Sequence, residues 1–144
     1  MYSAIDIAKY IIWYCKKKGY SISNLKLQKI LYFVQAAFLV DLGRPCFVDA
    51  IEAWDFGPVV SSVYHYFKIF GSGDIPKFVG INADEAIIRS DRKIIDEMID
   101  QCAEYSASSL VEITHNQAPW RDAYRKGCNN VINNEAIRMY FDED

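Results

Sequence analysis

The chain has 144 residues, of which 51% are hydrophobic and 24% are charged, and its formal net charge is −3. Glycine and proline number only 7 and 4, so the composition excludes a disordered, collagen-like or low-complexity protein. This length is typical of one globular domain, and we predict a single domain over residues 1–144. Aromatic residues reach 15%, more than one core of this size needs, so we expect some rings to serve a surface.

Charge is unevenly distributed along the chain. Residues 1–31 contain six lysines but only one acid, Asp6, which gives +5 and leaves −8 for the remainder. The lysines at 16–18 are typical of a solvated helix end, where cations interact favourably with the helix dipole. Such asymmetry also suggests contacts with a partner. Because the chain has no arginine-rich stripe, we expect no nucleic-acid partner.

Two helices are predicted in the first third of the chain. Ser3 can cap a helix over residues 4–18, which Gly19 would end. Ser23 can cap a second helix over about 24–41. Its apolar residues are Leu25, Leu27, Ile30, Leu31, Phe33, Val34, Phe38 and Leu39. Because they point in nearly every direction around the axis, this helix is expected to be buried at the centre of the fold.

Two polar and aromatic stripes run along the predicted central helix. They consist of Gln28, Tyr32 and Gln35, and beside them Lys26, Lys29 and Phe33. Two interpretations are open at this point. The side chains either satisfy backbone groups and extend to water, or they line a recognition groove.

A small β element is predicted after the central helix. Residues 47–54 partly alternate between apolar and polar, which indicates a short strand, and residues 86–88 are expected to pair with it. Gly57 permits a turn, and Pro58 suits the first turn of a helix that would stop at Gly71. A tryptophan placed like Trp54, just before this turn, is either a core anchor or an interface hot spot.

The second half of the chain is predicted to be helical again. Ser90 is expected to cap one helix, and Ser106 or Ser108 a second that ends near Ala118. Pro119 would begin a third helix, and Asn133 would cap the last, with the acidic end 142–144 frayed. The predicted fold is therefore mainly α: a compact helical domain around the buried helix 24–41, with an antiparallel β element near 47–53 and 86–88.

Catalytic and metal-binding motifs are absent from the sequence, so we predict no catalytic residue, no metal site and no cofactor. The four cysteines are far apart and contain no C-x-x-C pair, which indicates reduced, mostly buried thiols. No apolar run approaches the ~18 residues that a membrane helix needs, and no secretory signal is visible. We therefore expect a cytoplasmic protein without a membrane partner.

Three sequence motifs carry a resemblance to a known family. They lie at residues 23–35, at 51–60 with Val63 and Tyr64, and at 110–115 with Pro119 and Trp120. In this order they resemble the SocA-like antitoxin family, also called the Panacea domain, which includes phage-associated GepA-type proteins. The motifs extend over most of the chain, from about residue 3 to residue 125.

The resemblance implies a largely helical antitoxin, of bacterial or prophage origin, that neutralises a toxin encoded beside it by direct binding. In the family's namesake the antitoxin is a proteolytic adaptor, so the implied partners are a cognate toxin and an ATP-dependent protease. Many relatives carry an additional helix-turn-helix domain, for which we expect no room here. The motif residues of interest are Lys26, Gln28, Lys29, Tyr32, Gln35, Trp54, Gly57, Pro58, Tyr64, Thr114, His115 and Trp120. Partner specificity is expected after Gly127 or in the segment 71–89.

Two other functions remain as alternatives. The first is a small hydrolase in which His115 acts with a carboxylate or thiol brought near it by the fold. A His115 that is bonded only to backbone would argue against it. The second is a structural, phage-associated homodimer in which the aromatic surface self-associates.

Overall fold

The computed structural model describes residues 1–142, and its first two helices have the predicted bounds. Helix α1 runs over Ala4–Lys18 and helix α2 over Asn24–Asp41. Each has a serine N-cap, because the Ser3 hydroxyl accepts a hydrogen bond from the Asp6 N–H and the Ser23 hydroxyl accepts one from the Lys26 N–H. Short-range capping therefore suffices to define these helix starts.

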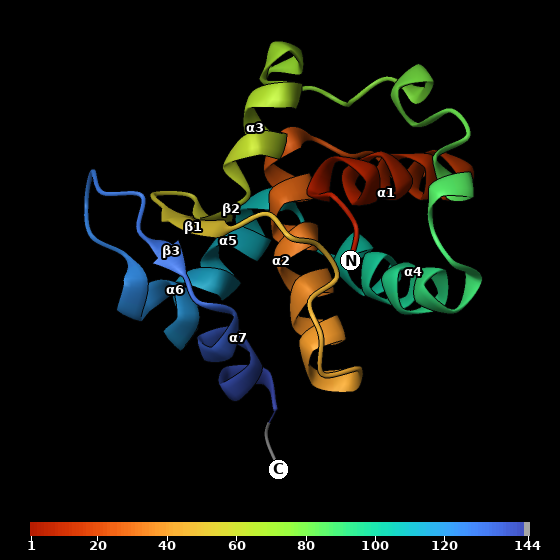
Figure 1. The fold of residues 1–144 in the computed structure, drawn as a ribbon. Coiled ribbons are helices and arrows are strands. Elements are labelled where there is room, and N and C mark those ends of the chain that lie inside the picture. Colours follow the sequence, from red (N-terminus) through yellow and green to blue (C-terminus); the bar gives the residue numbers. More distant parts are fainter. Residues whose placement is uncertain (143–144) are drawn as a thin grey trace.

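Helix α2 is the central element of the fold, as predicted. Figure 1 shows it running through the middle of the molecule, with α1 and α4 (Arg89–Ala103) on one side and the sheet and α7 (Asn134–Phe141) on the other. It contacts these three helices and also α3 (Ser61–Phe67), α5 (Ala107–His115) and strand β2 (Gly57–Val59). Most of its residues are buried, and these include the polar Asn24, Gln28, Lys29 and Gln35.

The sheet has three short antiparallel strands in the order β2-β1-β3. Strand β1 is Ile51–Trp54, β2 is Gly57–Val59 and β3 is Val131–Ile132. The predicted pairing with residues 86–88 is wrong. The partners of β1 are instead β2, where Trp54 pairs with Gly57 across a tight turn, and β3, where Ile51 pairs with Ile132. A hairpin this short closes at little entropic cost.

Residues 86–88 lie against the start of the chain instead. The 3₁₀ helix η3, Ala83–Ala86, ends there, and Ile87 is buried while Ile88 is exposed. The Ile88 N–H donates to the Tyr2 hydroxyl. The short apolar run at 86–88 therefore contributes one buried side chain, Ile87, and no strand.

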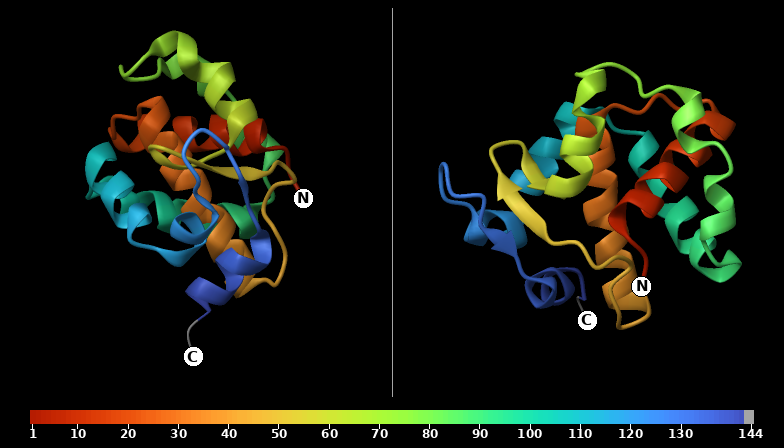
Figure 2. Two further views of the ribbon diagram at one scale, coloured as in Figure 1. Left: turned by 90° about the vertical axis from the view of Figure 1, so that its left-hand side faces the viewer. Right: turned by 45° about the horizontal axis from the view of Figure 1, so that its top comes forward.

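The segment after the hairpin differs from its prediction at its start. Helix α3 spans Ser61–Phe67 rather than beginning at Pro58, because residues 57–59 pair with β1. The 3₁₀ helix η1, Lys68–Phe70, continues it to Gly71 as expected. The following segment contains η2, Lys77–Gly80, which Figure 2 shows lying alongside α1.

Four helices complete the fold. They are α4 at Arg89–Ala103, α5 at Ala107–His115, α6 at Ala118–Ala123 and α7 at Asn134–Phe141. Ser106 and Asn133 cap α5 and α7 as predicted. Ser90 lies inside α4 rather than capping it. Within the predicted frayed end, Asp142 accepts a hydrogen bond from Arg138, and the other two residues lie outside the described part.

The fold class is confirmed: the chain is mainly α with a small antiparallel sheet. Cys15, Cys46 and Cys102 are buried, and Cys128 is exposed. Among the described residues, no helix combines the length and the apolar character that crossing a bilayer requires.

Candidate partner-binding site

Gln28 in the first motif joins α2 to the start of α3. Its side-chain carbonyl accepts a hydrogen bond of 2.9 Å from the Val60 N–H, and its amide donates to Asn24 over 2.9 Å. The Asn24 amide in turn donates to the Tyr64 carbonyl over 3.0 Å. Both amide side chains are buried, so this chain of bonds holds α3 in a fixed position on α2.

Gln35 holds the extended segment that precedes β1. Its side-chain carbonyl accepts from the N–H groups of Cys46 and Phe47, at 2.8 and 3.2 Å, and its amide donates to the Phe47 carbonyl at 3.1 Å. The backbone of this segment also bonds to Tyr2 in a parallel bridge, so Gln35 supplies its second set of hydrogen bonds. Of the two interpretations of the stripe, the first applies to Gln28 and Gln35, since both satisfy buried backbone groups.

Lys29 brings all three motifs together at one point. Its side chain is fully buried, and its ammonium donates to the Pro58 carbonyl over 2.9 Å. A β-carbon added to Gly57 would lie 2.9 Å from Lys29 Cε and 2.7 Å from the Thr114 hydroxyl, so only glycine fits between them. Burial lowers the pKa of Lys29 to about 7. The lysine is thus packed against the turn, out of reach of a partner.

Tyr32 links α2 to the connection between α5 and α6. Its hydroxyl donates to the Gln117 side-chain carbonyl over 2.8 Å, and its ring makes an edge contact with Phe141 of α7. Burial raises the pKa of this tyrosine. Tyr32 is therefore a buried structural residue as well.

A stack of three aromatic rings also supports the hairpin turn. The Trp120 ring lies between His115 and Tyr124, with centroid distances of 4.0 and 4.5 Å. The Trp120 indole donates to the Trp54 carbonyl over 2.7 Å, and the Tyr124 hydroxyl donates to the Asp55 carboxylate. The third motif thus fixes the backbone at the tip of the hairpin.

His115 contacts this same backbone. Its Nε2 lies 2.9 Å from the Asp55 main-chain carbonyl, and its ring stacks on Trp120. A hydrolase would need a carboxylate or thiol beside this ring, whereas the observed partner is a peptide carbonyl. The geometry therefore does not favour the hydrolase alternative. Within residues 1–142, no cluster of three or more His, Cys, Asp or Glu side chains is placed to hold a metal.

The exposed part of the site is a groove at the tip of the hairpin. It is lined by residues 23–25, Phe56, Tyr64, residues 71–72 and Ala107, and its volume is about 330 Å³. We call it the hairpin-tip groove. Phe56 forms one wall. This residue lies in the rigid hairpin turn, and 49% of it is exposed. The adjoining rings of Trp54 and Tyr64 pack edge to face, with centroids 5.0 Å apart.

The structure divides the predicted site residues into two groups. The buried ones are Gln28, Lys29, Tyr32, Gln35, Gly57, Pro58 and Thr114. The half-buried ones are Lys26, Trp54, Tyr64, His115 and Trp120. Phe56, Asn24 and Tyr124 were not among the predicted site residues. The spacing of Asn24 one helical turn before Gln28 is the signal that could have identified it.

Comparison with known proteins agrees with the motifs. The family model described as "Antitoxin SocA-like, Panacea domain" matches residues 27–121. A curated relative described as "Antitoxin SocA", from Caulobacter vibrioides (strain NA1000 / CB15N), is 41% identical over 113 residues. That match covers 69% of this chain and 58% of the relative, so the chain spans less than two thirds of the relative's length. No solved structure shows a significant match.

Proposed function

Because the chain belongs to the SocA-like antitoxin family, with its Panacea domain, we propose that it is an antitoxin that neutralises a cognate toxin by binding it directly. We place the toxin contact at the hairpin-tip groove. The observation that carries this placement is that the three family motifs converge on the hairpin and hold an exposed aromatic residue, Phe56, at its tip. The motif residues form the support, and the groove is the surface that they present.

The rigidity of the turn supports this role. Trp120 and Tyr124 fix the turn on one side, and Lys29 bonds to Pro58 on the other. A side chain that is already ordered in the free protein loses little conformational entropy on binding. Aromatic residues of this kind are typical hot spots, because a large apolar area is desolvated on contact with a partner.

The composition of the groove also suits a protein partner. Leu25, Phe56, Tyr64 and Ala107 give it mainly apolar walls, and Ser23 and Ser72 add hydroxyl groups at its edge. A mainly apolar patch with a few polar groups is the usual anatomy of an interface core. Delivery of the toxin to an ATP-dependent protease, a cytoplasmic location and homodimer formation stay predictions.

Co-expression with the product of the adjacent gene tests the proposed function. We expect the antitoxin to restore growth of cells that express the neighbouring protein, and the two proteins to purify together. A toxic neighbour that this chain neither binds nor neutralises would contradict the proposal.

Replacement of Phe56 by serine tests the position of the contact. We expect affinity for the toxin to fall at least about tenfold, because a hot-spot ring is lost. The melting temperature should stay close to that of the wild type, since half of the Phe56 surface is already exposed. Titration calorimetry and thermal unfolding measure the two quantities.

Met139→Ser provides a matched control. Met139 is 65% exposed and lines a separate apolar hollow between α6 and α7. We expect this variant to bind the toxin as the wild type does. If Met139→Ser weakens binding and Phe56→Ser does not, the toxin contacts α6 and α7 instead of the hairpin-tip groove.

A further inference from the structure

A second surface with a different chemistry lies on the outer side of α1. Trp13, Lys16 and Lys17 of α1 face Lys77, Ile81 and Asn82 from the segment that contains η2, across a hollow of about 350 Å³. We call these six residues the Trp13 face. Among the described residues that line it, three are lysines and none is acidic.

The segment opposite α1 is held closely in place. A β-carbon on Gly80 would lie 2.8 Å from the Trp13 backbone nitrogen and 2.9 Å from the Lys9 carbonyl, so η2 packs directly on the helix. This close packing fixes the positions of Lys77 and Ile81 relative to Trp13. The Trp13 face is thus formed by two elements in a defined arrangement, rather than by one helix alone.

Two of its lysines are available for a partner. Lys16 is paired with Asp74, whose carboxylate lies 2.5 Å from its ammonium. Lys17 and Lys77 are exposed, and the ammonium of Lys17 lies 5.1 Å from the centre of the Trp13 ring. A carboxylate placed beside Trp13 would therefore meet Lys17, with Lys77 on the opposite wall.

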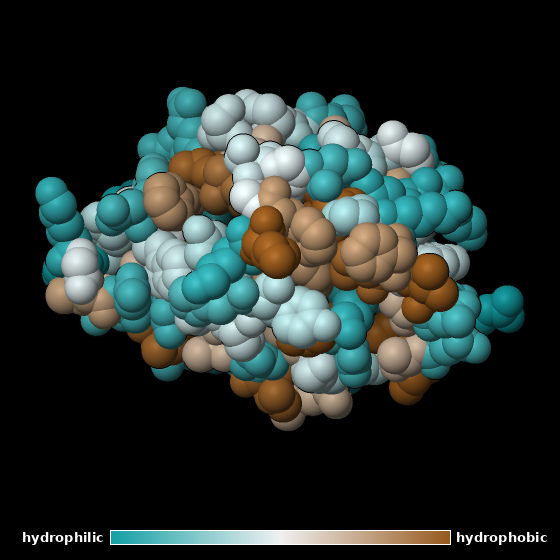
Figure 3. All heavy atoms as spheres, turned by 90° about the horizontal axis from the view of Figure 1, so that it is seen from above, coloured by the Kyte–Doolittle hydropathy of each residue, from teal (hydrophilic) through white to brown (hydrophobic). Residues whose placement is uncertain are grey.

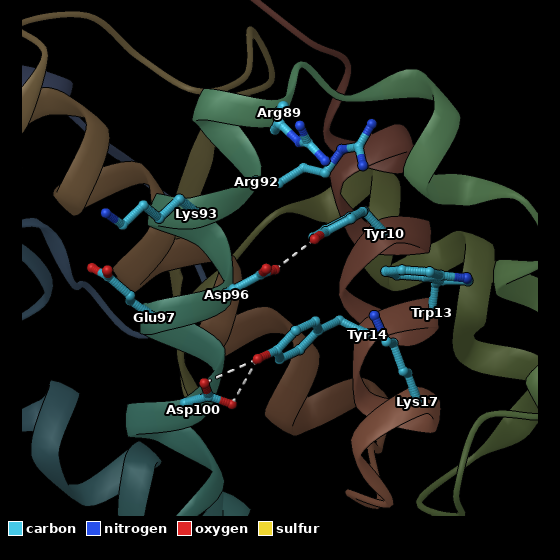
Figure 4. A pocket seen from close by; sticks show the side chains of 10 residues that line it. All are labelled: Tyr10, Trp13, Tyr14, Lys17, Arg89, Arg92, Lys93, Asp96, Glu97 and Asp100. Carbon is cyan, nitrogen blue, oxygen red and sulfur yellow. Dashed lines mark hydrogen bonds between the residues drawn. The ribbon is translucent and has the colours of Figure 1, made fainter.

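The positive surface continues into a neighbouring hollow, shown in Figure 4. Arg89 and Arg92 lie near its upper end, and Trp13 and Lys17 border both hollows. Glu97 also lines it, and Figure 4 shows this side chain extending away from α1, as Lys93 does.

The other two carboxylates of this hollow are bonded to tyrosines. Asp96 accepts a hydrogen bond of 2.5 Å from Tyr10, and Asp100 accepts bonds from Tyr14 and Tyr20 at 2.9 and 2.8 Å. Both carboxylates are therefore engaged by tyrosine hydroxyls. Arg92 is in turn bonded to the Ile87 carbonyl.

Exposed apolar side chains accompany the positive charge. Ile81 of the Trp13 face is 64% exposed, and Phe78, which lies in η2 beside Lys77, is 66% exposed. Figure 3, which views the molecule from above, shows brown apolar residues in a row beside teal hydrophilic ones. A surface that combines large apolar residues with one sign of charge is typical of an interaction site.

We propose that the Trp13 face binds an acidic protein segment that carries at least one large apolar side chain. The apolar side chain packs against Trp13 and Ile81, and flanking carboxylates pair with Lys17 and Lys77. Charge complementarity selects this partner, because the chain as a whole is acidic and concentrates its positive charge near α1. A nucleic acid fits less well, because the chain has no arginine-rich stripe that could follow a phosphate backbone.

Titration of the full-length, isotope-labelled protein with synthetic peptides tests the proposal by nuclear magnetic resonance. The probe is a short peptide of glutamates with interspersed leucine and phenylalanine. We expect shifts of the Trp13 indole signal and of residues 77–82. A peptide with serine in place of leucine and phenylalanine should bind roughly tenfold more weakly, and high salt should weaken binding further.

Charge reversal supplies the matched variants. Lys77→Glu should weaken binding of the acidic peptide severalfold, whereas Lys126→Glu, the same charge change at another exposed lysine, should not. Both side chains are exposed, so melting temperatures should match the wild type. The proposal is overturned if the acidic peptide leaves the Trp13 indole unshifted at millimolar concentration, or if both variants bind alike. Binding of a DNA oligonucleotide or of anionic lipid vesicles, in place of the peptide, also overturns it.

Discussion

Replacement of Gly57 by alanine is expected to lower the free energy of unfolding by about 2 to 5 kcal/mol. Gly57 has a φ of 97°, which strains any residue with a β-carbon. The added carbon would also press against the Thr114 hydroxyl and the Lys29 side chain, at 2.7 and 2.9 Å. Because these neighbours belong to a packed core, the cost of overpacking adds to the backbone strain. Urea unfolding followed by circular dichroism measures the loss.

Gly127→Ala is the control that separates strain from packing. Gly127 has a φ of 76°, but no described atom lies within 4 Å of an added β-carbon. We therefore expect this variant to lose only about 1 to 2 kcal/mol. If Gly57→Ala is no less stable than Gly127→Ala, the three motifs do not meet as tightly at Gly57 as the structure indicates.

The buried Lys29 is expected to make stability rise with pH between about 7 and 8. Burial lowers its pKa to about 7, whereas in the unfolded chain the lysine has its usual value of 10.5. Between these values the unfolded state binds one more proton than the folded state, so the free energy of unfolding increases with pH. The slope is about 1.4 kcal/mol per pH unit. Below pH 7 both states are protonated, and the full cost of burying the charge remains.

Buried cysteines set the upper limit of the pH range in which the effect of Lys29 on stability can be measured. Burial raises the pKa of Cys15, Cys46 and Cys102 from 9.0 to about 12. Above about pH 9 the unfolded thiols lose their protons first, so the stability that these groups contribute falls as pH increases. Because the unfolded thiols already begin to lose their protons above about pH 8, and three thiols offset the single lysine before pH 9, the rise due to Lys29 is best measured between pH 7 and 8.

Substitution of Lys29 by methionine isolates the effect of this lysine. We expect the rise between pH 7 and 8 to disappear in Lys29→Met, because no buried ammonium remains to lose its proton. Lys26→Met is the control, since Lys26 is only half-buried on the same helix, and it should retain the slope. A wild-type protein whose stability is flat over this range would show that Lys29 is not buried as described.

The two helices in the first third of the chain could be predicted because the residues that start and end a helix act locally. Ser3 and Ser23 cap α1 and α2, and Gly19 ends α1 with a positive φ. The strand pairing could not be predicted in the same way. Pro58 favours a helix start as much as a strand edge, and only the pairing of Trp54 with Gly57 decides between them.

The candidate site was predicted in its residues but not in their roles. The polar stripe on α2 identified Gln28 and Gln35. Helical spacing does not reveal, however, which groups their side chains bond to. Their partners are backbone groups of segments 46–47 and 60, which the tertiary fold brings to α2. Phe56 was missed as a site residue because its exposure depends on a turn whose geometry is fixed by Trp120 and Tyr124.

Hydrogen–deuterium exchange of the protein, alone and with the proposed toxin bound, tests the placement of the toxin contact most directly. Buried motif residues on α2 should exchange slowly in both states, because they hold the core. Binding is expected to slow exchange at residues 54–57, at 71–73 and at the start of α5, which surround the hairpin-tip groove. Slower exchange confined to α6 and α7, with the groove unchanged, would contradict a toxin contact at the hairpin tip.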